Sequence, residues 1–395
     1  MRAVPLSIAA YTASCAAGSG RRAILESLRT RRSGLSANTF TESPLDTFIG
    51  RVPEIESHAL PADLAHWECR NNRLAWHGLQ QDGFFEAVQS AREKYGSGRV
   101  AVVLGTSTSS IGATEEGYRR LTADGQYPEE LRRPPVHTVH SLGSFVQEAL
   151  GLTGVSVTVA TACSSSAKVF PQAERLIRLG LADAAVVGGV DTLCYSVLFG
   201  FNALELVSAE PCRPFDPERK GISLGEAAGF ALLEKHGSGP RLLGYGESSD
   251  AHHMSSPHPE GLGARNAIQD ALMRASLTPG DIDYINLHGT ASQKNDEVEA
   301  RIVATLFPEA TRASSTKGWT GHALGAAGIL EAVISLLSLE NGFMPGTLNT
   351  RELDVSCGPQ IRLENSDGRV RHAMSNSFGF GGSNCVLLFG AAGVQ

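Results

Sequence analysis

The sequence predicts an α/β protein made of two similar halves. Short runs of β-branched and aliphatic residues alternate along the chain with segments whose apolar residues recur every three or four positions, the pattern of strands alternating with helices. Several pieces of this pattern occur twice at a long period, which indicates a duplicated half and not a solenoid of short repeats. We therefore expect an N-terminal half, residues 1–240, and a C-terminal half, residues 241–395, that share one core.

Three pairs of segments carry the predicted duplication. Two strands each end in a Gly-Thr motif, two glycine-rich turns each enter an apolar strand, and two strands each lead through small residues toward a helix. The paired segments are 99–107 with 282–291, 221–234 with 375–389, and the stretch around Cys163 with residues 313–317 and the helix expected at 325–339. Catalytic residues would then come from matching strand ends of both halves. Chance similarity of short Gly-Thr motifs is the alternative.

Composition limits the class of protein. The chain has 395 residues, 42% hydrophobic and 19% charged, as in an ordinary globular enzyme, and its net charge of -7 argues against nucleic acid as the main partner. The seven cysteines are scattered without a CxxC pair, which predicts a reducing cytoplasm and no zinc knuckle. The N-terminus becomes polar too soon for a signal peptide, and no apolar run approaches the roughly 18 residues that span a bilayer, so we expect no membrane association.

The first hundred residues contain the elements that such a half requires. Apolar residues predict a strand at 4–10 and a short helix at 23–31, whereas three prolines make residues 33–62 irregular. Helical spacing predicts one helix from 75 to 94, and the run at 99–104 predicts a buried strand.

The next elements lead to and past a central stretch. A polar, proline-containing segment at 122–135 is expected on the surface, followed by a helix at 142–150. β-branched residues from Val155 onward predict a buried strand, helical spacing follows from Val169 to Leu181, and residues 184–190 predict another strand.

Cys163 is the first candidate for chemistry. It lies where the strand from Val155 gives way to a helix, so unpaired backbone N–H groups and the helix dipole would stabilise an anion there. A thiol in this position is expected to have a lowered pKa and to react as a thiolate nucleophile. The alternative is a buried cysteine that acts as a small apolar residue.

The C-terminal half supplies three more candidates. His288 follows a strand, His322 lies in a segment of small residues after Lys317, and the turn 378–382 could direct backbone N–H groups at an oxyanion. Each alone has an ordinary explanation: a hydrogen-bonded structural histidine, a solvated lysine or a tight turn. Together with the thiol they form one constellation at strand–helix junctions.

These motifs, in this order, resemble those of the β-ketoacyl-acyl-carrier-protein synthases of the elongating type, which have a Cys-His-His centre. The matching segments are 161–166, 214–216, 225–226, 250–254, 288–290, 317–328 and 376–384. The resemblance implies the duplicated thiolase-like five-layer αβαβα fold, with the nucleophilic cysteine in the first half and the two histidines in the second.

The resemblance also implies a reaction, the decarboxylative Claisen condensation. Cys163 would accept an acyl chain from a carrier protein as a thioester. His288 and His322 would hydrogen-bond the malonyl thioester oxygen while loss of carbon dioxide creates an enolate. The backbone N–H groups of Cys163 and Phe378 would form the oxyanion hole, and Phe378 would gate the acyl pocket.

Further roles come from the same resemblance. Lys317 would position the first histidine and tune the local field, Glu331 would order this network, and Asp296 would support it. Thr290 and Ser292 would bind the phosphopantetheine arm of the carrier protein. No free cofactor and no metal are expected, because both substrates are carried on that arm.

Three assignments concern substrate and partners. Ile111 would line the acyl tunnel, with core packing as the alternative. Arg70 and Arg73 would dock the acidic carrier protein, with ordinary surface arginines as the alternative. Residues 137–150 resemble the family's dimer interface.

Departures from the family pattern bear on the pathway. The loop 291–296 lacks the usual second threonine and Pro-x-Gly, while Ala227 and Ser383 replace a usual glycine and threonine. These departures favour a specialised pathway, such as aryl polyene or other polyketide synthesis, whose synthases often pair with a related chain-length-factor subunit. We therefore expect either a homodimer or a heterodimer with such a subunit. Alternatives are a non-catalytic partner subunit, which would lack the cysteine, and a coenzyme-A-dependent thiolase or priming synthase, which would use another cysteine or an asparagine in place of one histidine.

Overall fold

The computed structural model describes residues 5–394. Its main element is an 11-stranded mixed sheet, in which β2 (Gly18–Ser19) pairs only with β1. The other strands lie in the order β12 (Arg312–Ser314), β11 (Tyr284–Asn286), β15 (His372–Gly379), β16 (Ser383–Gly390), β10 (Arg241–Ser249), β1 (Leu6–Cys15), β9 (Ala227–Glu234), β7 (Ala184–Asp191), β5 (Val100–Gly105) and β6 (Ser156–Val159).

The sheet consists of two units with the same topology. In the first unit β1, β9 and β7 pair antiparallel, and β7, β5 and β6 pair parallel. In the second, β10, β16 and β15 pair antiparallel, and β15, β11 and β12 pair parallel. Only two residue pairs join β1 to β10. Corresponding segments of the predicted duplication therefore occupy corresponding strands, and the duplication is confirmed, while the boundary at residue 240 stays a prediction.

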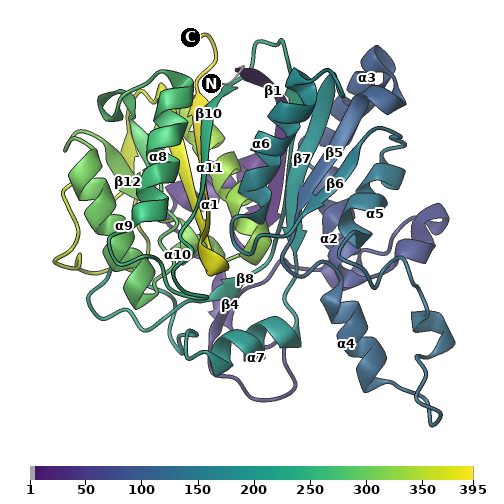
Figure 1. Ribbon diagram of the computed structural model, residues 1–395. Coiled ribbons are helices and arrows are strands. Elements are labelled where there is room, and N and C mark those ends of the chain that lie inside the picture. The colour runs from purple at the N-terminus through teal and green to yellow at the C-terminus, as the bar shows by residue number, and fades with distance from the viewer. Residues whose placement is uncertain (1–4, 395) are drawn as a thin grey trace.

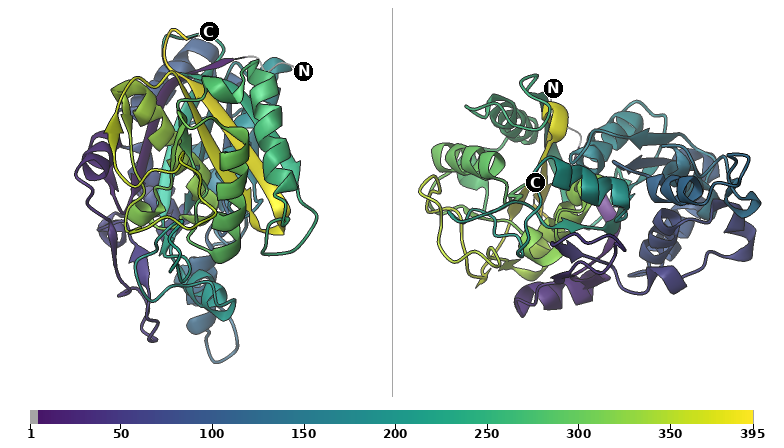
Figure 2. Two further views of the ribbon diagram at one scale, coloured as in Figure 1. Left: turned by 90° about the vertical axis from the view of Figure 1, so that its left-hand side faces the viewer. Right: turned by 90° about the horizontal axis from the view of Figure 1, so that it is seen from below.

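Helices complete five layers, as expected for the αβαβα fold (Figure 1). The outer helices of the first unit are α2 (Arg70–Leu79), α3 (Phe84–Tyr95) and α5 (Ser141–Ala149), and those of the second are α8 (Leu262–Ala275) and α9 (Gln293–Leu306). Figure 2 shows α8 and α9, in green, over the yellow strands of the second unit. The middle layer consists of α6 (Ser165–Arg178) and α11 (Ala327–Asn341).

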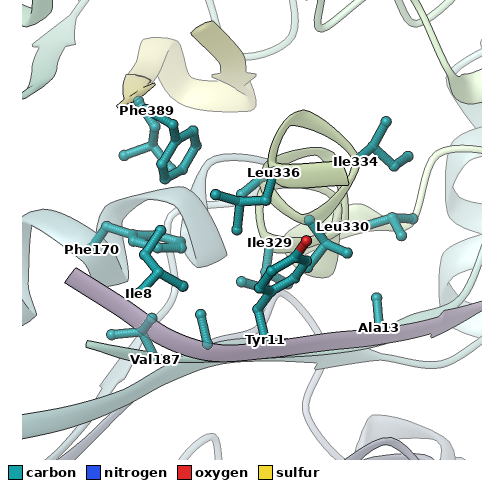
Figure 3. Packing of buried hydrophobic residues seen from close by; sticks show 14 of the residues in the cluster. Ile8, Tyr11, Ala13, Phe170, Val187, Ile329, Leu330, Ile334, Leu336 and Phe389 are labelled. Atoms are coloured by element: carbon teal, nitrogen blue, oxygen red, sulfur yellow. The ribbon is translucent and has the colours of Figure 1, made fainter. Parts of the chain in front are cut away.

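The middle layer joins the two units through one apolar core. Figure 3 shows residues of α11 facing β1, with Phe170 of α6 beside Phe389 of β16; these two rings lie 5.7 Å apart between centroids. The two helices cross closely, since a Cβ on Gly328 would come within 2.6 Å of the Ala167 nitrogen. The helix that follows Cys163 and the helix that carries Glu331 are thereby held against each other.

The apolar character of α11 explains one wrong prediction. The segment Leu324–Asn341 is long and apolar enough to cross a membrane by length and composition, although no apolar run of this length was expected. In the structure 89% of it is buried inside the protein. A helix packed between the two units of the sheet is covered on all sides and therefore needs no polar face.

The remaining elements lie around this frame. The other helices are α1 (Arg21–Arg29), α4 (Ile111–Arg119), α7 (Tyr195–Ala203) and α10 (Lys317–Thr320). Short strands are β3 (Leu35–Ala37), β4 (Phe48–Gly50), β8 (Leu224–Gly225), β13 (Phe343–Met344) and β14 (Ser366–Asp367). The region 33–62 is thus less irregular than predicted, because β3 pairs with β4 and β4 pairs with β8.

Four other local predictions need correction. Residues 75–94 form parts of two helices, because Asp82 and Gly83 adopt left-handed conformations with φ of 55° and 69°. β6 is an edge strand with a partly exposed pattern, so the strand after Val155 is not buried. α6 ends at Arg178, and Leu181 is 51% exposed. The strand expected at 4–10 runs to Cys15, and its first residue lies outside the described part of the chain.

Candidate active site

Cys163 lies in a tight turn between β6 and α6. Ala162 has a left-handed φ of 52°, and α6 begins two residues after the thiol. Side chains tie the turn: the hydroxyl of Ser165 donates to the Ala162 carbonyl at 2.6 Å, and that of Ser164 to the Thr161 carbonyl at 2.9 Å. The small residues of this stretch allow the turn, and they place Cys163 at a helix N-terminus as predicted.

The resting thiol is not the thiolate that was expected. Burial raises the pKa of Cys163 to about 11, although the Lys317 charge and the Phe380 backbone N–H act in the opposite direction. The prediction of a lowered pKa is therefore wrong, because desolvation of the thiolate outweighs the effect of the helix N-terminus. The thiol is protonated at neutral pH and loses its proton as it reacts.

Two histidines from the C-terminal half face this thiol. A ring nitrogen of His288, a ring nitrogen of His322 and the Cys163 sulfur all lie within 4.8 Å of one another, and all three residues are buried. The two imidazole rings are 5.4 Å apart between centroids and nearly perpendicular, at 88°. The constellation predicted from the sequence is therefore assembled in one place.

The loop that carries His288 is held by a buried carboxylate. Glu299 on α9 accepts hydrogen bonds from the backbone N–H groups of His288 at 2.9 Å and Gly289 at 2.8 Å. The Asn376 side-chain amide also donates to Glu299, at 3.0 Å. Glu299 was not predicted from the sequence. Its place on the apolar side of α9, one helical turn after Asn295, is the signal that could have indicated it.

Both imidazoles are uncharged hydrogen-bonding groups. Burial, with a contribution from Lys317, lowers the pKa of His288 and His322 well below the usual value. The Leu324 backbone N–H donates to Nδ1 of His322 at 3.2 Å, so the proton of this imidazole is on Nε2. His322 thus presents an N–H donor, as stabilisation of a developing oxyanion requires.

The hydrogen bond from the Leu324 N–H to Nδ1 of His322 argues against a soft metal ion at the Cys-His-His group. A histidine that binds a metal usually donates its other ring N–H to an acceptor, whereas Nδ1 of His322 is itself an acceptor.

Lys317 connects the histidine loop to the central helix. Its side chain is 2% exposed, and Nζ contacts both the His288 carbonyl oxygen and Oε1 of Glu331 on α11. The contact with His288 is thus to its backbone and not to its ring. Burial raises the pKa of Glu331 to about 7, against the opposing effect of the Lys317 charge.

Stability should therefore depend on the protonation of Glu331. Its pKa is raised from 4.5 on folding, so between pH 4.5 and 7 the native state holds a proton that the unfolded chain has lost. This group makes the free energy of unfolding fall as pH rises through that window. We expect Glu331→Gln to remove this part of the slope in urea titrations at several pH values. Glu93→Gln, on an exposed face, should keep the slope, and an unchanged slope in the Glu331 variant would disprove the assignment.

A second phenylalanine, not selected from the sequence, adjoins the thiol. The backbone N–H of Phe380 faces the Cys163 thiol and acts to lower its pKa. The predicted donor, Phe378, instead lies within β15, and its ring is 5.9 Å from the His288 ring. The chain reverses after Phe380 through Gly381, with φ of 77°. The glycine pair following Phe380 was the signal in the sequence, since glycine readily adopts the positive φ that such a reversal needs.

The three side chains open into a cavity of about 270 Å³ lined by residues of both halves. At its wall the Phe380 ring stacks on the Phe201 ring, 5.6 Å away. Thr290 and Ser292 line it too, and their hydroxyls are 2.9 Å apart. Asp296, predicted as a supporting residue, is buried and accepts the backbone N–H groups of Phe215 at 2.8 Å and Ala291 at 3.1 Å.

Three predicted residues lie elsewhere. Ile111 begins α4, is 37% exposed and does not line this cavity within the described chain. Arg70 is bonded to the fully buried carboxylate of Glu226 and to Glu56, and Arg73 to Glu68. The pocket role of Ile111 and the docking roles of the two arginines stay predictions. The ion pairs within the chain neutralise the positive charges with which the arginines would bind the acidic carrier protein.

Comparison with known proteins agrees with this geometry. The β-ketoacyl synthase N-terminal domain matches residues 69–238, and the C-terminal domain matches residues 241–351. Nodulation protein E of Rhizobium leguminosarum bv. trifolii is 32% identical over 397 residues, 95% of this chain and 96% of that protein. The chain belongs to the β-ketoacyl synthase family.

Other relatives extend the similarity. The mitochondrial 3-oxoacyl-[acyl-carrier-protein] synthase of Arabidopsis thaliana is 38% identical over 278 residues, 65% of this chain, and the match spans 60% of that protein's length. One chain of the complex between the ketosynthase ApeO and its chain length factor ApeC, from Xenorhabdus doucetiae, superimposes with a TM-score of 0.90 at 35% identity, covering 98% of both chains. The fold and the order of the motifs are therefore those of ketosynthases.

Proposed function

We propose that this family member catalyses chain elongation, the decarboxylative condensation of an acyl group with malonyl-acyl-carrier protein. The observation that carries the proposal is the meeting of the Cys163 thiol with two uncharged histidines within 4.8 Å in one buried cavity. A nucleophile beside two neutral hydrogen-bonding groups suits covalent acyl transfer followed by enolate formation. A non-catalytic partner subunit would have no use for the thiol.

The first half-reaction loads the enzyme. The Cys163 sulfur attacks the carbonyl carbon of an acyl thioester, the C–S bond to the carrier breaks, and the carrier thiol leaves with the proton that Cys163 gives up. The tetrahedral oxyanion would be stabilised by the backbone N–H groups of Cys163 and Phe380, at the helix N-terminus. We assign this second donor to Phe380 in place of Phe378.

The second half-reaction makes the new carbon–carbon bond. Malonyl thioester loses carbon dioxide, and its carbonyl oxygen, which becomes the enolate oxygen, accepts hydrogen bonds from His288 and His322. The enolate carbon attacks the acyl carbonyl on Cys163, the C–S bond to Cys163 breaks, and the thiolate that leaves takes up a proton from solvent. The product is a 3-oxoacyl thioester that is two carbons longer. Lys317 would serve by holding the His288 backbone, which sets the ring position.

The substrates would reach Cys163 along the cavity. Thr290 and Ser292 offer hydroxyl groups to the amide-containing phosphopantetheine arm, and the stacked rings of Phe380 and Phe201 would gate the passage. We propose that no free cofactor takes part, since the arm belongs to the carrier protein. We place the reaction in the cytoplasm, where such carriers are acylated.

Our proposal for the partners rests on the relatives, and our proposal for the pathway rests on the departures from the family pattern. Because ApeO was solved with a chain length factor, and another ketosynthase with a type II polyketide acyl-carrier protein, we propose an acyl-carrier protein and a related second subunit as partners. The departures at residues 291–296 favour a specialised polyketide pathway, such as aryl polyene synthesis, over housekeeping fatty-acid synthesis.

Reconstitution tests this assignment. The purified chain, alone and co-expressed with the related subunit from its own source, is incubated with malonyl-carrier protein and primers on carrier protein or on coenzyme A. We expect condensation from carrier-bound primers, and activity only in the co-expressed complex if that subunit is obligatory. Efficient turnover of coenzyme A thioesters without carrier protein would favour the thiolase or priming-synthase alternative.

A further inference from the structure

A buried arginine, Arg219, lies in the wall of the cavity and takes no part in the proposed chemical steps. Arg219 belongs to the N-terminal half, its side chain is 2% exposed, and it lines the cavity next to Ser292 and Gln293 of the C-terminal half. A buried guanidinium is costly unless its donors are paired. The partners it has therefore indicate what it holds in place.

The guanidinium binds both halves at once. Nη1 donates to the Asp216 carbonyl at 2.8 Å and to the Asp354 carboxylate at 2.9 Å. Nη2 donates to the Gln293 carbonyl at 3.0 Å, and Nε to the Ser292 carbonyl at 3.4 Å. Planar, multidentate contacts of this kind fix orientation in a way that a lysine cannot reproduce.

Gln293 returns the contact. Its side-chain Nε2 donates to the Arg219 carbonyl at 2.6 Å, so the two residues are joined in both directions. Gln293 is the first residue of α9, in the loop 291–296 that departs from the pattern of related synthases. The preceding residue, Ser292, carries one of the two cavity hydroxyls. Restraint of its carbonyl by Arg219 therefore restrains that wall of the cavity.

We propose that Arg219 and Gln293 form a clamp between the two halves that positions the Thr290–Ser292 wall for the thioester arm of the incoming substrate. Both are positioning residues, because they act on that wall through the backbone. The ion pair with Asp354 supplies the charge that keeps Arg219 in place: the Ser356 N–H and Arg219 hold the pKa of Asp354 down, to about 2. The proposal rests on the proposed function, in which that wall binds the arm.

Steady-state kinetics of the co-expressed, carrier-dependent enzyme test the clamp. We expect Arg219→Lys to raise the KM for malonyl-carrier protein about tenfold, the scale of one hydrogen bond to a charged group, with kcat within roughly twofold of the parent. Gln293→Ala should raise KM less, and the double variant no more than Arg219→Lys alone, since the pair acts as a unit. The rate of Cys163 alkylation by iodoacetamide should stay unchanged.

A matched arginine variant controls for the general effect of weakening an arginine–aspartate pair, which does not depend on the clamp. Arg274→Lys alters such a pair on α8, away from the cavity, and should leave KM unchanged. An Arg219→Lys variant with the KM of Arg274→Lys, or one that lowers kcat and alkylation with no change in KM, would overturn the proposal. If Arg219→Lys does not fold, Gln293→Ala carries the test, because an unchanged KM there overturns it too.

Thr290→Val separates this proposal from the assignment of the arm. If Thr290→Val also raises KM, the hydroxyl wall binds the arm as proposed. If Thr290→Val has no effect while Arg219→Lys raises KM, the clamp stands and the proposed hydroxyl contact fails.

Discussion

Replacing Cys163 by alanine should abolish chain elongation, with a fall in kcat on the order of 10⁶-fold, the scale seen when a covalent nucleophile is removed. The sulfur is the only atom in the proposed mechanism that can hold the acyl chain between the two half-reactions. The histidine pair does not depend on it, so malonyl-carrier protein should still be decarboxylated by the variant. Release of carbon dioxide and formation of the 3-oxoacyl product are measured in parallel.

The matched control is Cys357→Ala. This cysteine is half-buried among residues packed against the second unit, away from the cavity lining, and its loss should leave both activities unchanged. Substantial elongation by the Cys163 variant would contradict the covalent mechanism. Loss of decarboxylation along with elongation would show that the thiol takes part in both half-reactions.

Replacing His322 by alanine should slow condensation by about 10²–10³-fold, as expected for loss of one preorganised oxyanion donor. The chain would keep the Cys163 thiol and the backbone N–H of Phe380, so acylation of Cys163 should remain rapid. Single-turnover experiments that follow acylation and condensation separately check this division. His288→Ala should act on the same step, and the double variant should fall by less than the product of the two effects, because both imidazoles serve one oxygen.

The exposed His66 provides the control for this series. It pairs with Glu148, and neither residue lines the cavity, so His66→Ala should leave both steps unchanged. If His322→Ala slows acylation as much as condensation, His322 also acts in transfer of the acyl group to the thiol. The proposed assignment of His322 to the condensation step alone would then be wrong.

The sequence predicts the duplicated frame well because the signals are local. The apolar run of β5 and the small residues around Cys163 depend on neighbours within a few positions, and both appear where expected. The break near Asp82 and Gly83 was missed because apolar spacing continues across it, although the Asp-Gly pair is itself a turn signal in the sequence. Likewise, β6 has the composition of a buried strand although it lies at an edge.

The parts of the site that were missed depend on tertiary structure. The choice of Phe380 over Phe378 depends on where β15 ends and the chain reverses. The attachment of Arg70 to the buried Glu226, 156 residues away, cannot be inferred from a local motif. The raised pKa of Cys163 follows from the depth of burial, which outweighs the helix N-terminus that the sequence indicated.

The most direct test of the central claim is intact-protein mass spectrometry of the chain, with its related subunit, during one catalytic cycle. Incubation with acyl-carrier protein should add the mass of one acyl group, located on the peptide that contains Cys163. Addition of malonyl-carrier protein should remove that mass and yield a carrier-bound 3-oxoacyl product two carbons longer. Absence of any adduct on Cys163, or an adduct that malonyl-carrier protein leaves in place, would contradict the covalent condensation mechanism.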